Sequence, residues 1–295
     1  MTKMMTALLA IEANPDLDTP VTLPEEIFPA LQAQNASLAG FQAEETATVR
    51  DLLYGAMLPR GPNAARTLAR EVSGSEEAFV ARMNQKAAEL GMTGTHFCNP
   101  TGLHDPEHVS TVRDMARLTE AALQNETFRK LFTTERYTVP ATNCHPQGFT
   151  MHSTLLSQLD GTELHRGRIL GGKTGYTGEA GLCLASLAEV KGREYILVTA
   201  GAGGNHSTAP YHIEDAVTVY RRGEPGGLNR GADTLPFSMP GFVVQWNKTI
   251  HRTGEPSCSR IHRSDLCGRT RFTRTAPCLP GTRRFRLPAR LAAAA

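Results

Sequence analysis

The stretch that most constrains the fold is residues 168–200, where three strand-like runs are joined by two short turns. The second and third runs, GLCLASLAEV at 181–190 and EYILVTA at 194–200, flank a Lys-Gly-Arg turn and predict a β-hairpin. The first run leads into Lys173-Thr174-Gly175 and then into a glycine-rich exit. We therefore expect three consecutive antiparallel strands, the first of which carries a Lys-Thr-Gly triplet suited to a carboxylate-bearing ligand laid along its edge.

Helical spacing dominates the chain before these strands. Thr48-x-x-Asp51 and Thr111-x-x-Asp114 predict capping boxes, and Gly91 predicts the C-terminal end of a helix. We expect helices at residues 2–13, 48–57, 63–72, 76–90, 111–124 and 211–220, with a loop at 14–45. Helices followed by antiparallel strands and a closing helix predict an α+β fold in which a helical cluster packs on the sheet.

Charge divides the chain into two parts at Tyr220. Residues 1–220 carry 17 Lys and Arg against 25 Asp and Glu, a net charge of −8, whereas residues 221–295 carry 14 against 4, a net charge of +10. Of the 14 cations in the second part 13 are arginine, and neither helical nor alternating periodicity is sustained there. We predict one domain at 1–220 and a disordered Arg/Pro-rich tail at 221–295, with the composition of a frameshifted sequence.

Several classes of function are disfavoured. No run of 18 apolar residues predicts a membrane span, and no phosphate-binding glycine loop predicts nucleotide use. The cysteines match no zinc spacing, and Cys98, Cys144 and Cys183 fit buried hydrophobic positions without a disulfide network. His96, His104 and His108 fit turn and packing roles. We expect no metal and no cofactor.

Four segments together identify a family resemblance. TKMMTALLAIE (2–12), LGMTGTHFCNPTGL (90–103), STVRDMARL (110–118) and GGKTGYTGEAG (171–181) resemble the serine-type D-alanyl-D-alanine carboxypeptidases, the low-molecular-mass penicillin-binding proteins. The resemblance runs in order from residue 2 to about residue 220 and leaves out the tail. It implies a β-lactamase/transpeptidase-like fold, peptidoglycan stem peptides and β-lactams as ligands, and an exported protein.

The resemblance also implies site residues. The family uses Ser-x-x-Lys, Ser-x-Asn and Lys-Thr-Gly elements. Lys3 matches the lysine that accepts the proton of the nucleophilic serine, and Lys173, Thr174 and Gly175 match the triplet that holds the terminal carboxylate. The backbone N–H of Tyr176 matches one donor of the oxyanion hole.

Two elements depart from the family pattern. The serine of Ser-x-x-Lys falls one position before Met1, so we expect a chain that lacks its first strands and leaves an open sheet edge. In MLPRGPNAA (57–65), Arg60 stands where the relay serine belongs and Pro62 where the asparagine belongs. Asn63, one position late, could take the asparagine's place only in a rebuilt loop. Ser153 has no lysine three residues on and makes a poor substitute nucleophile.

Three hypotheses follow for the function. The first is a D-alanyl-D-alanine carboxypeptidase by lineage that is inactive as written, and the second is a non-catalytic binder of stem peptides or penicillin. The third, nucleic-acid binding by the basic tail, lacks the interleaved aromatic residues typical of such segments. If Met1 is the true start, the chain has no signal peptide and is expected in the cytoplasm.

Overall fold

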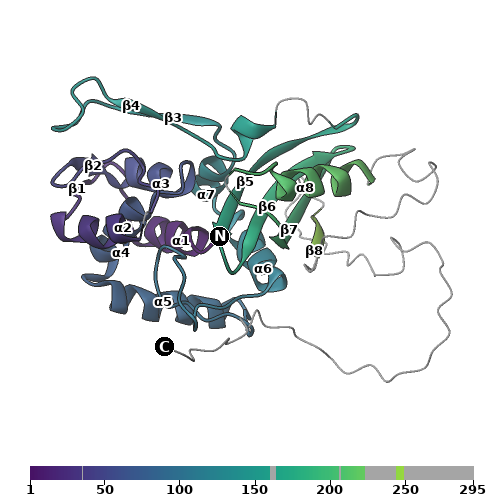
Figure 1. Cartoon of the computed structure of the whole chain (residues 1–295), viewed down its shortest axis with the longest axis horizontal. Coiled ribbons are helices and arrows are strands. Elements are labelled where there is room, and N and C mark those ends of the chain that lie inside the picture. Colours follow the sequence, from purple (N-terminus) through teal and green to yellow (C-terminus); the bar gives the residue numbers. More distant parts are fainter. Residues whose placement is uncertain (35, 160–163, 206, 223–243, 249–295) are drawn as a thin grey trace, which may run out of the picture.

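The computed structural model describes residues 1–34, 36–159, 164–205, 207–222 and 244–248. Figure 1 shows most helices gathered on one side of the molecule and an antiparallel sheet with helix α8 (Tyr211–Arg222) on the other. The first helix, α1 (Lys3–Ala13), begins next to the sheet. The α+β class and the separation of helices from the sheet are confirmed.

The sheet contains the three strands expected from residues 168–200. Strands β5 (Gly167–Thr177), β6 (Gly181–Val190) and β7 (Arg193–Ala202) pair antiparallel in that order. Lys191 and Gly192 both have positive φ, 55° and 72°, which suits the tight two-residue turn of the hairpin. Strand β5 lies at one edge of the sheet and brings the Lys-Thr-Gly triplet to that edge.

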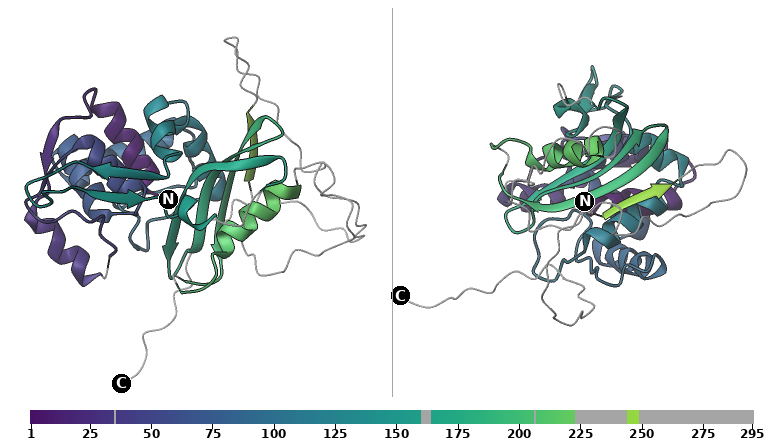
Figure 2. Two further views of the ribbon diagram at one scale, coloured as in Figure 1. Left: turned by 90° about the horizontal axis from the view of Figure 1, so that it is seen from above. Right: turned by 90° about the vertical axis from the view of Figure 1, so that its right-hand side faces the viewer.

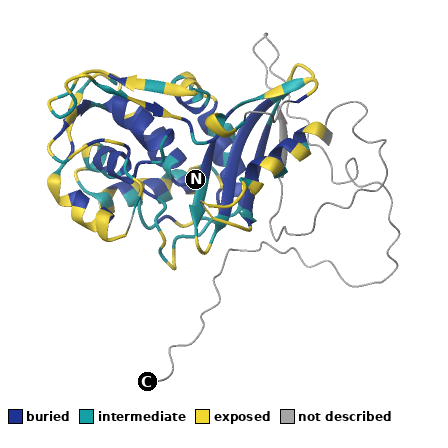
Figure 3. Ribbon diagram, turned by 45° about the horizontal axis from the view of Figure 1, so that its top comes forward, coloured by how far each residue is buried: buried dark blue, intermediate teal, exposed yellow. Residues whose placement is uncertain are grey.

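Both faces of the sheet are buried, which explains the nearly continuous apolar runs in β6 and β7. On one face, Leu184 and Leu197 pack with Tyr220 of α8. On the other face, Ala185 and Val198 join the main core of the helical side. Figure 2 shows α8 on the side of the sheet that faces away from the helices, and Figure 3 shows the strands between them as buried. The sheet is therefore the central layer of the fold, with helices packed on both of its faces.

The longer helices agree with the expected ones to within a few residues. They are α1, α3 (Val49–Met57), α4 (Pro62–Ser73), α5 (Glu76–Glu89), α6 (Val112–Ala122) and α8. The Thr48–Asp51 capping box is present in full. At α6 only half of the expected box forms, because the Asp114 carboxylate accepts hydrogen bonds from Gly94 N and Thr95 Oγ1 instead of the cap backbone.

Short elements were missed by the sequence analysis. The expected loop at 14–45 contains strand β1 (Pro20–Thr22), a 3-10 turn (Glu25–Ile27) and helix α2 (Phe28–Ala33). The others are β2 (Thr46–Thr48), α7 (Glu126–Phe132), the hairpin β3 (Arg136–Val139) and β4 (Phe149–His152), and a second 3-10 turn (Leu156–Gln158). These segments are too short for periodicity to rise above the background.

The far edge of the sheet differs from the expected open edge. Strand β8 (Val244–Lys248) pairs antiparallel with β7, with Ile196 opposite Trp246. It comes from the segment for which we expected disorder, and the rest of residues 223–295 lies outside the described part of the chain. No helix in the described ranges is both long and apolar enough to cross a bilayer.

Candidate active site

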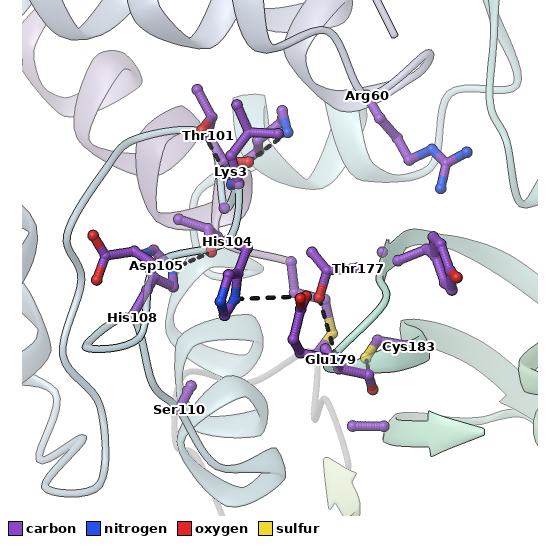
Figure 4. Close-up of a pocket in the computed structure, with 18 of the residues that line it drawn as sticks. Lys3, Arg60, Thr101, His104, Asp105, His108, Ser110, Thr177, Glu179 and Cys183 are labelled. Atoms are coloured by element: carbon purple, nitrogen blue, oxygen red, sulfur yellow. Dashed lines mark hydrogen bonds and ion pairs between the residues drawn. The ribbon is translucent and has the colours of Figure 1, made fainter. Parts of the chain in front are cut away.

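A cavity of about 630 Å³ lies between the helical side and the β5 edge. Four chain segments supply most of its lining: the start of α1, the loop between α3 and α4, the loop before α6 with the start of α6, and β5 with the turn that follows it. Residues 34, 36 and 37 and single residues of β6 and β7 complete it. They bring together Lys3, Arg60, Lys173, Thr174, Gly175 and Tyr176, which are separated by up to 173 positions in the sequence. Figure 4 shows Lys3 and Arg60 on the upper side of this pocket.

Lys3 lies in the first turn of α1 and reaches across to the loop before α6. Its Nζ donates a hydrogen bond to Thr101 O at 2.6 Å. That loop is shaped by Asn99, whose Oδ1 accepts from Thr101 N, Thr101 Oγ1 and Gly102 N. Burial, and then the charge of Arg60, lower the pKa of Lys3 to about 7. A lysine with this pKa is partly neutral at pH 7 and can accept a proton.

Lys173 and Thr174 lie on β5, where burial and hydrogen bonds hold both side chains in place. Lys173 is only 2% exposed, and its Nζ donates to Thr174 O at 3.2 Å. The Thr174 hydroxyl lies 2.6 Å from Thr154 Oγ1. Burial, followed by the charges of Lys3 and Arg60, holds the pKa of Lys173 well below its usual value. Lys3 and Arg60 are therefore close enough to Lys173 to disfavour its charged form.

Gly175 is where β5 approaches the start of α1. A Cβ atom at this position would lie 3.1 Å from the backbone nitrogen of Met1, so a side chain here would crowd the residue that leads into α1. Tyr176, the next residue, also lines the pocket. The absence of a side chain at Gly175 thus fits the close packing of β5 against the start of the chain.

Arg60 extends from a tight turn into the pocket. It has a φ of 69°, a left-handed conformation that is uncommon for a residue other than glycine. Gly61 follows because a Cβ there would lie 2.3 Å from Ala39 Cβ and 2.9 Å from Gly55 O. Within the described residues Arg60 has no hydrogen bond or ion pair. Burial lowers its pKa, and Figure 4 shows its side chain lying apart from the other labelled groups.

Asn63 does not replace the asparagine that the pattern lacks. It is fully buried, its Oδ1 accepts from Ala39 N at 3.1 Å, and its Nδ2 donates to Phe41 O at 3.3 Å. Pro62 begins α4 and lines the pocket, whereas Asn63 does not. The structure therefore places Asn63 in the helical core.

His108 holds the first turn of α1 in place, which agrees with the packing role expected from the sequence, although the sequence did not reveal Thr2 as its partner. Its Nδ1 accepts a hydrogen bond from Cys98 N at 3.1 Å, so the proton is on Nε2, which donates to Thr2 Oγ1 at 2.8 Å. Burial lowers the pKa of His108 to about 4, which keeps the ring neutral. In this tautomer His108 cannot accept the proton of Thr2, so the pair is structural.

A second histidine connects the two sides of the pocket. His104 Nδ1, on the loop before α6, lies 3.5 Å from Glu179 Oε2 on the turn after β5. Figure 4 shows this pair crossing between the two segments. Both side chains are more than a third exposed, so the interaction is a weak surface contact.

The remaining candidates lie elsewhere. Ser153 is 4% exposed, its Oγ accepts from Leu156 N, and it does not line the pocket. Cys98, Cys144 and Cys183 are free thiols, and of these only Cys183 is buried as expected. The described residues contain no group of three or more His, Cys, Asp or Glu side chains arranged to hold a metal ion.

The chain is similar in sequence to proteins of known family. Residues 1–204 match the sequence profile of the D-alanyl-D-alanine carboxypeptidases. A Bacillus subtilis D-alanyl-D-alanine carboxypeptidase, DacF, is 37% identical over 210 residues, which make up 68% of this chain and 50% of the relative. A Streptomyces D-alanyl-D-alanine carboxypeptidase is 32% identical over 234 residues, 75% of this chain and 77% of that protein.

Solved structures show the same likeness. A serine-to-alanine variant of the Streptomyces K15 DD-transpeptidase superposes with a TM-score of 0.66 at 31% identity, covering 75% of this chain and 86% of that one. A Mycobacterium tuberculosis D-alanyl-D-alanine carboxypeptidase superposes with a TM-score of 0.61 at 28% identity, covering 74% and 78%. The described fold is thus that of the DD-transpeptidases.

Proposed function

The chain belongs to the D-alanyl-D-alanine carboxypeptidase family, and from that premise we propose that its pocket binds the C-terminus of peptidoglycan stem peptides without efficient turnover. The chain spans only half the length of its Bacillus relative, so the activity is proposed for this pocket alone. The observation that carries the proposal is the position of Arg60, which lines the pocket with Lys3 and Lys173 where the family pattern expects a serine.

Binding is supported by the edge position of β5. An edge strand offers backbone hydrogen bonds to an extended peptide, and Lys173 with Thr174 lies on the same strand. A carboxylate bound beside Lys173 would favour the protonated form of this lysine, and the resulting ion pair would be strong because little water competes at a buried site. We assign the terminal carboxylate of the peptide to Lys173 and Thr174, and one oxyanion-hole donor to the backbone N–H of Tyr176.

Low turnover is supported by the chemistry of the relay position. Acyl transfer needs a nucleophile, a base and a group that passes a proton to the leaving amine. Lys3, with its pKa of about 7, can serve as the base for a nucleophile three positions before it, and that position lies outside the sequence. A guanidinium group holds its proton at neutral pH, so Arg60 cannot pass one on. Pro62 brings no amide side chain to the place of the asparagine.

A binding experiment tests the proposal. Acetyl-D-Ala-D-Ala should bind to the chain, as measured by calorimetry, while acetyl-D-Ala-D-alaninamide, which lacks the terminal carboxylate, should bind at least about tenfold more weakly. The variant Lys173→Met should lose this preference. Equal binding of the two peptides to the unaltered chain would refute recognition of the carboxylate.

The alternative candidate is an active carboxypeptidase that forms an acyl-enzyme, and the depressed pKa of Lys3 favours it. Under either function the stem peptide and β-lactams are the proposed ligands, which implies a place of action outside the cytoplasm. Nucleic-acid binding depends on the tail, and no described residue favours it.

A further inference from the structure

Arg60 gives the pocket a cationic group beyond the two lysines of the family pattern. Lys3, Arg60 and Lys173 line one cavity but come from three different segments of the chain. Lys3 and Lys173 each donate a hydrogen bond to a backbone carbonyl, at Thr101 and Thr174, and Arg60 has no partner within the described residues. The cavity therefore holds three basic side chains, of which the guanidinium of Arg60 keeps its charge at neutral pH, and none of the three forms an ion pair in the part of the chain described.

The carboxylates at the pocket do not balance this charge. Glu179 pairs with His104, and Asp105 accepts a hydrogen bond from Glu107 N. No carboxylate is among the causes that shift the pKa of Lys3, Arg60 or Lys173, all of which are lowered by burial, with the two lysines lowered further by neighbouring cations. An anionic ligand would favour the charged forms of the lysines, and a single carboxylate held at β5 would leave the guanidinium of Arg60 without a partner among the described residues.

The shape of the Arg60 side chain selects the kind of anion. Its guanidinium presents several N–H donors in a planar fork that matches the two oxygens of a carboxylate. The left-handed backbone at Arg60 and the crowding around Gly61 fix the turn that presents it. Arg60 lies on the loop between α3 and α4 and Lys173 on β5, so the two basic groups line the pocket from different segments of the chain.

We propose that Arg60 binds a second carboxylate, so that the pocket prefers peptides with an acidic side chain near a free C-terminal carboxylate. This inference rests on the proposed binding of the peptide C-terminus at β5. It assigns to Arg60 a role in specificity in place of the proton relay that the family pattern expects at this position.

The test uses peptides that differ only in charge. Acetyl-D-Glu-D-Ala is compared with acetyl-D-Gln-D-Ala, and acetyl-D-Glu-D-Ala-D-Ala with acetyl-D-Gln-D-Ala-D-Ala, by calorimetry on the full chain. In at least one pair the glutamyl peptide should bind about tenfold more tightly than its glutaminyl counterpart, the effect of one well-placed charged hydrogen-bonding pair.

Three variants test whether Arg60 causes the preference for the glutamyl peptide. Arg60→Gln should bring the two members of that pair to equal affinity, whereas Arg60→Lys should retain part of the preference because it keeps the charge without the fork. Arg136→Gln, an exposed arginine on β3 that does not line the pocket, serves as the control for lost net charge and should leave the preference unchanged. Circular dichroism shows whether each variant is folded.

The outcomes separate this inference from the proposed function. If all four peptides bind but neither pair shows a preference, or if the preference survives Arg60→Gln in a folded variant, the role of Arg60 is refuted and carboxylate binding at β5 stands. If no peptide binds to the unaltered chain, the proposed function fails and the inference fails with it.

Discussion

At the scale of single residues, burial is the largest cause of the lowered pKa values in the pocket. Lys3 owes its lowered pKa first to desolvation and then to Arg60, and Lys173 owes its lowered pKa first to desolvation and then to Lys3 and Arg60. His108 is neutral for the same reason and positions α1 through Thr2. These groups acquire their properties from neighbours that are distant in the sequence.

The lowered lysine pKa predicts a pH dependence of stability. The folded-state pKa of Lys3 is about 7 and its unfolded value is about 10.5, so between these values the unfolded state binds more protons. Stability should therefore rise with pH across this window, by about 1 kcal/mol per pH unit. Urea unfolding at pH 7 and pH 9 measures the slope. The variant Lys3→Met should show a smaller slope, and an unchanged slope would contradict the assigned pKa.

Removal of the His108 ring should loosen the start of α1. His108→Ala deletes the hydrogen bonds to Thr2 and Cys98, and we expect a loss of about 1–3 kcal/mol of unfolding free energy. Binding of acetyl-D-Ala-D-Ala should also weaken, because Lys3 is in the same turn. His96→Ala, which alters an exposed histidine on the same loop, is the control. If both variants bind the peptide as the unaltered chain does, His108 has no positioning role.

At the scale of elements, the α3–α4 turn decides what the pocket contains. Its geometry turns Arg60 toward the cavity and sends Asn63 into the core, where Ala39 and Phe41 satisfy its amide. The turn depends on Gly61, since no side chain fits between it and Ala39. The residues of this turn therefore decide that a guanidinium group, and not an amide, faces the pocket.

Gly61→Ala should destabilise this turn. The new methyl group would overlap Ala39 and the Gly55 carbonyl, and overpacking of this kind costs about 1–3 kcal/mol. Chemical denaturation measures the loss, and Gly178→Ala, at a position with no heavy atom within 4 Å, should change stability by less than about 0.5 kcal/mol. Equal effects of the two substitutions would contradict the steric explanation.

At the scale of the whole molecule, the sheet joins the parts of the chain and leaves β5 open for a ligand. Its other edge is paired with β8, which follows α8 in the sequence by 21 residues. A chain shortened to residues 1–222 should therefore expose the β7 edge and aggregate more readily than one that ends at residue 248. Light scattering during heating compares the two, and identical behaviour would show that β8 does not protect the edge.

Sequence reasoning succeeded where the determinants are local. The Thr48–Asp51 cap, the Gly91 stop and the Lys191-Gly192 turn are each decided within a few residues. The contact between His108 and Thr2 joins positions 106 residues apart, and β8 pairs through backbone atoms that composition does not reveal. The orientation of Asn63 depends on partners 22 and 24 residues away. Long-range packing decided these features.

The most direct test of the account is acylation by benzylpenicillin, followed by intact-mass measurement. The chain is extended so that a serine stands three residues before Lys3, with Arg60 and Pro62 either retained or changed by Arg60→Ser and Pro62→Asn. We predict no adduct on the unextended chain, slow acylation after extension, and a gain of several orders of magnitude after the double substitution. An adduct on the unextended chain, or equal rates with and without Arg60, would contradict the claim that this arginine replaces the relay.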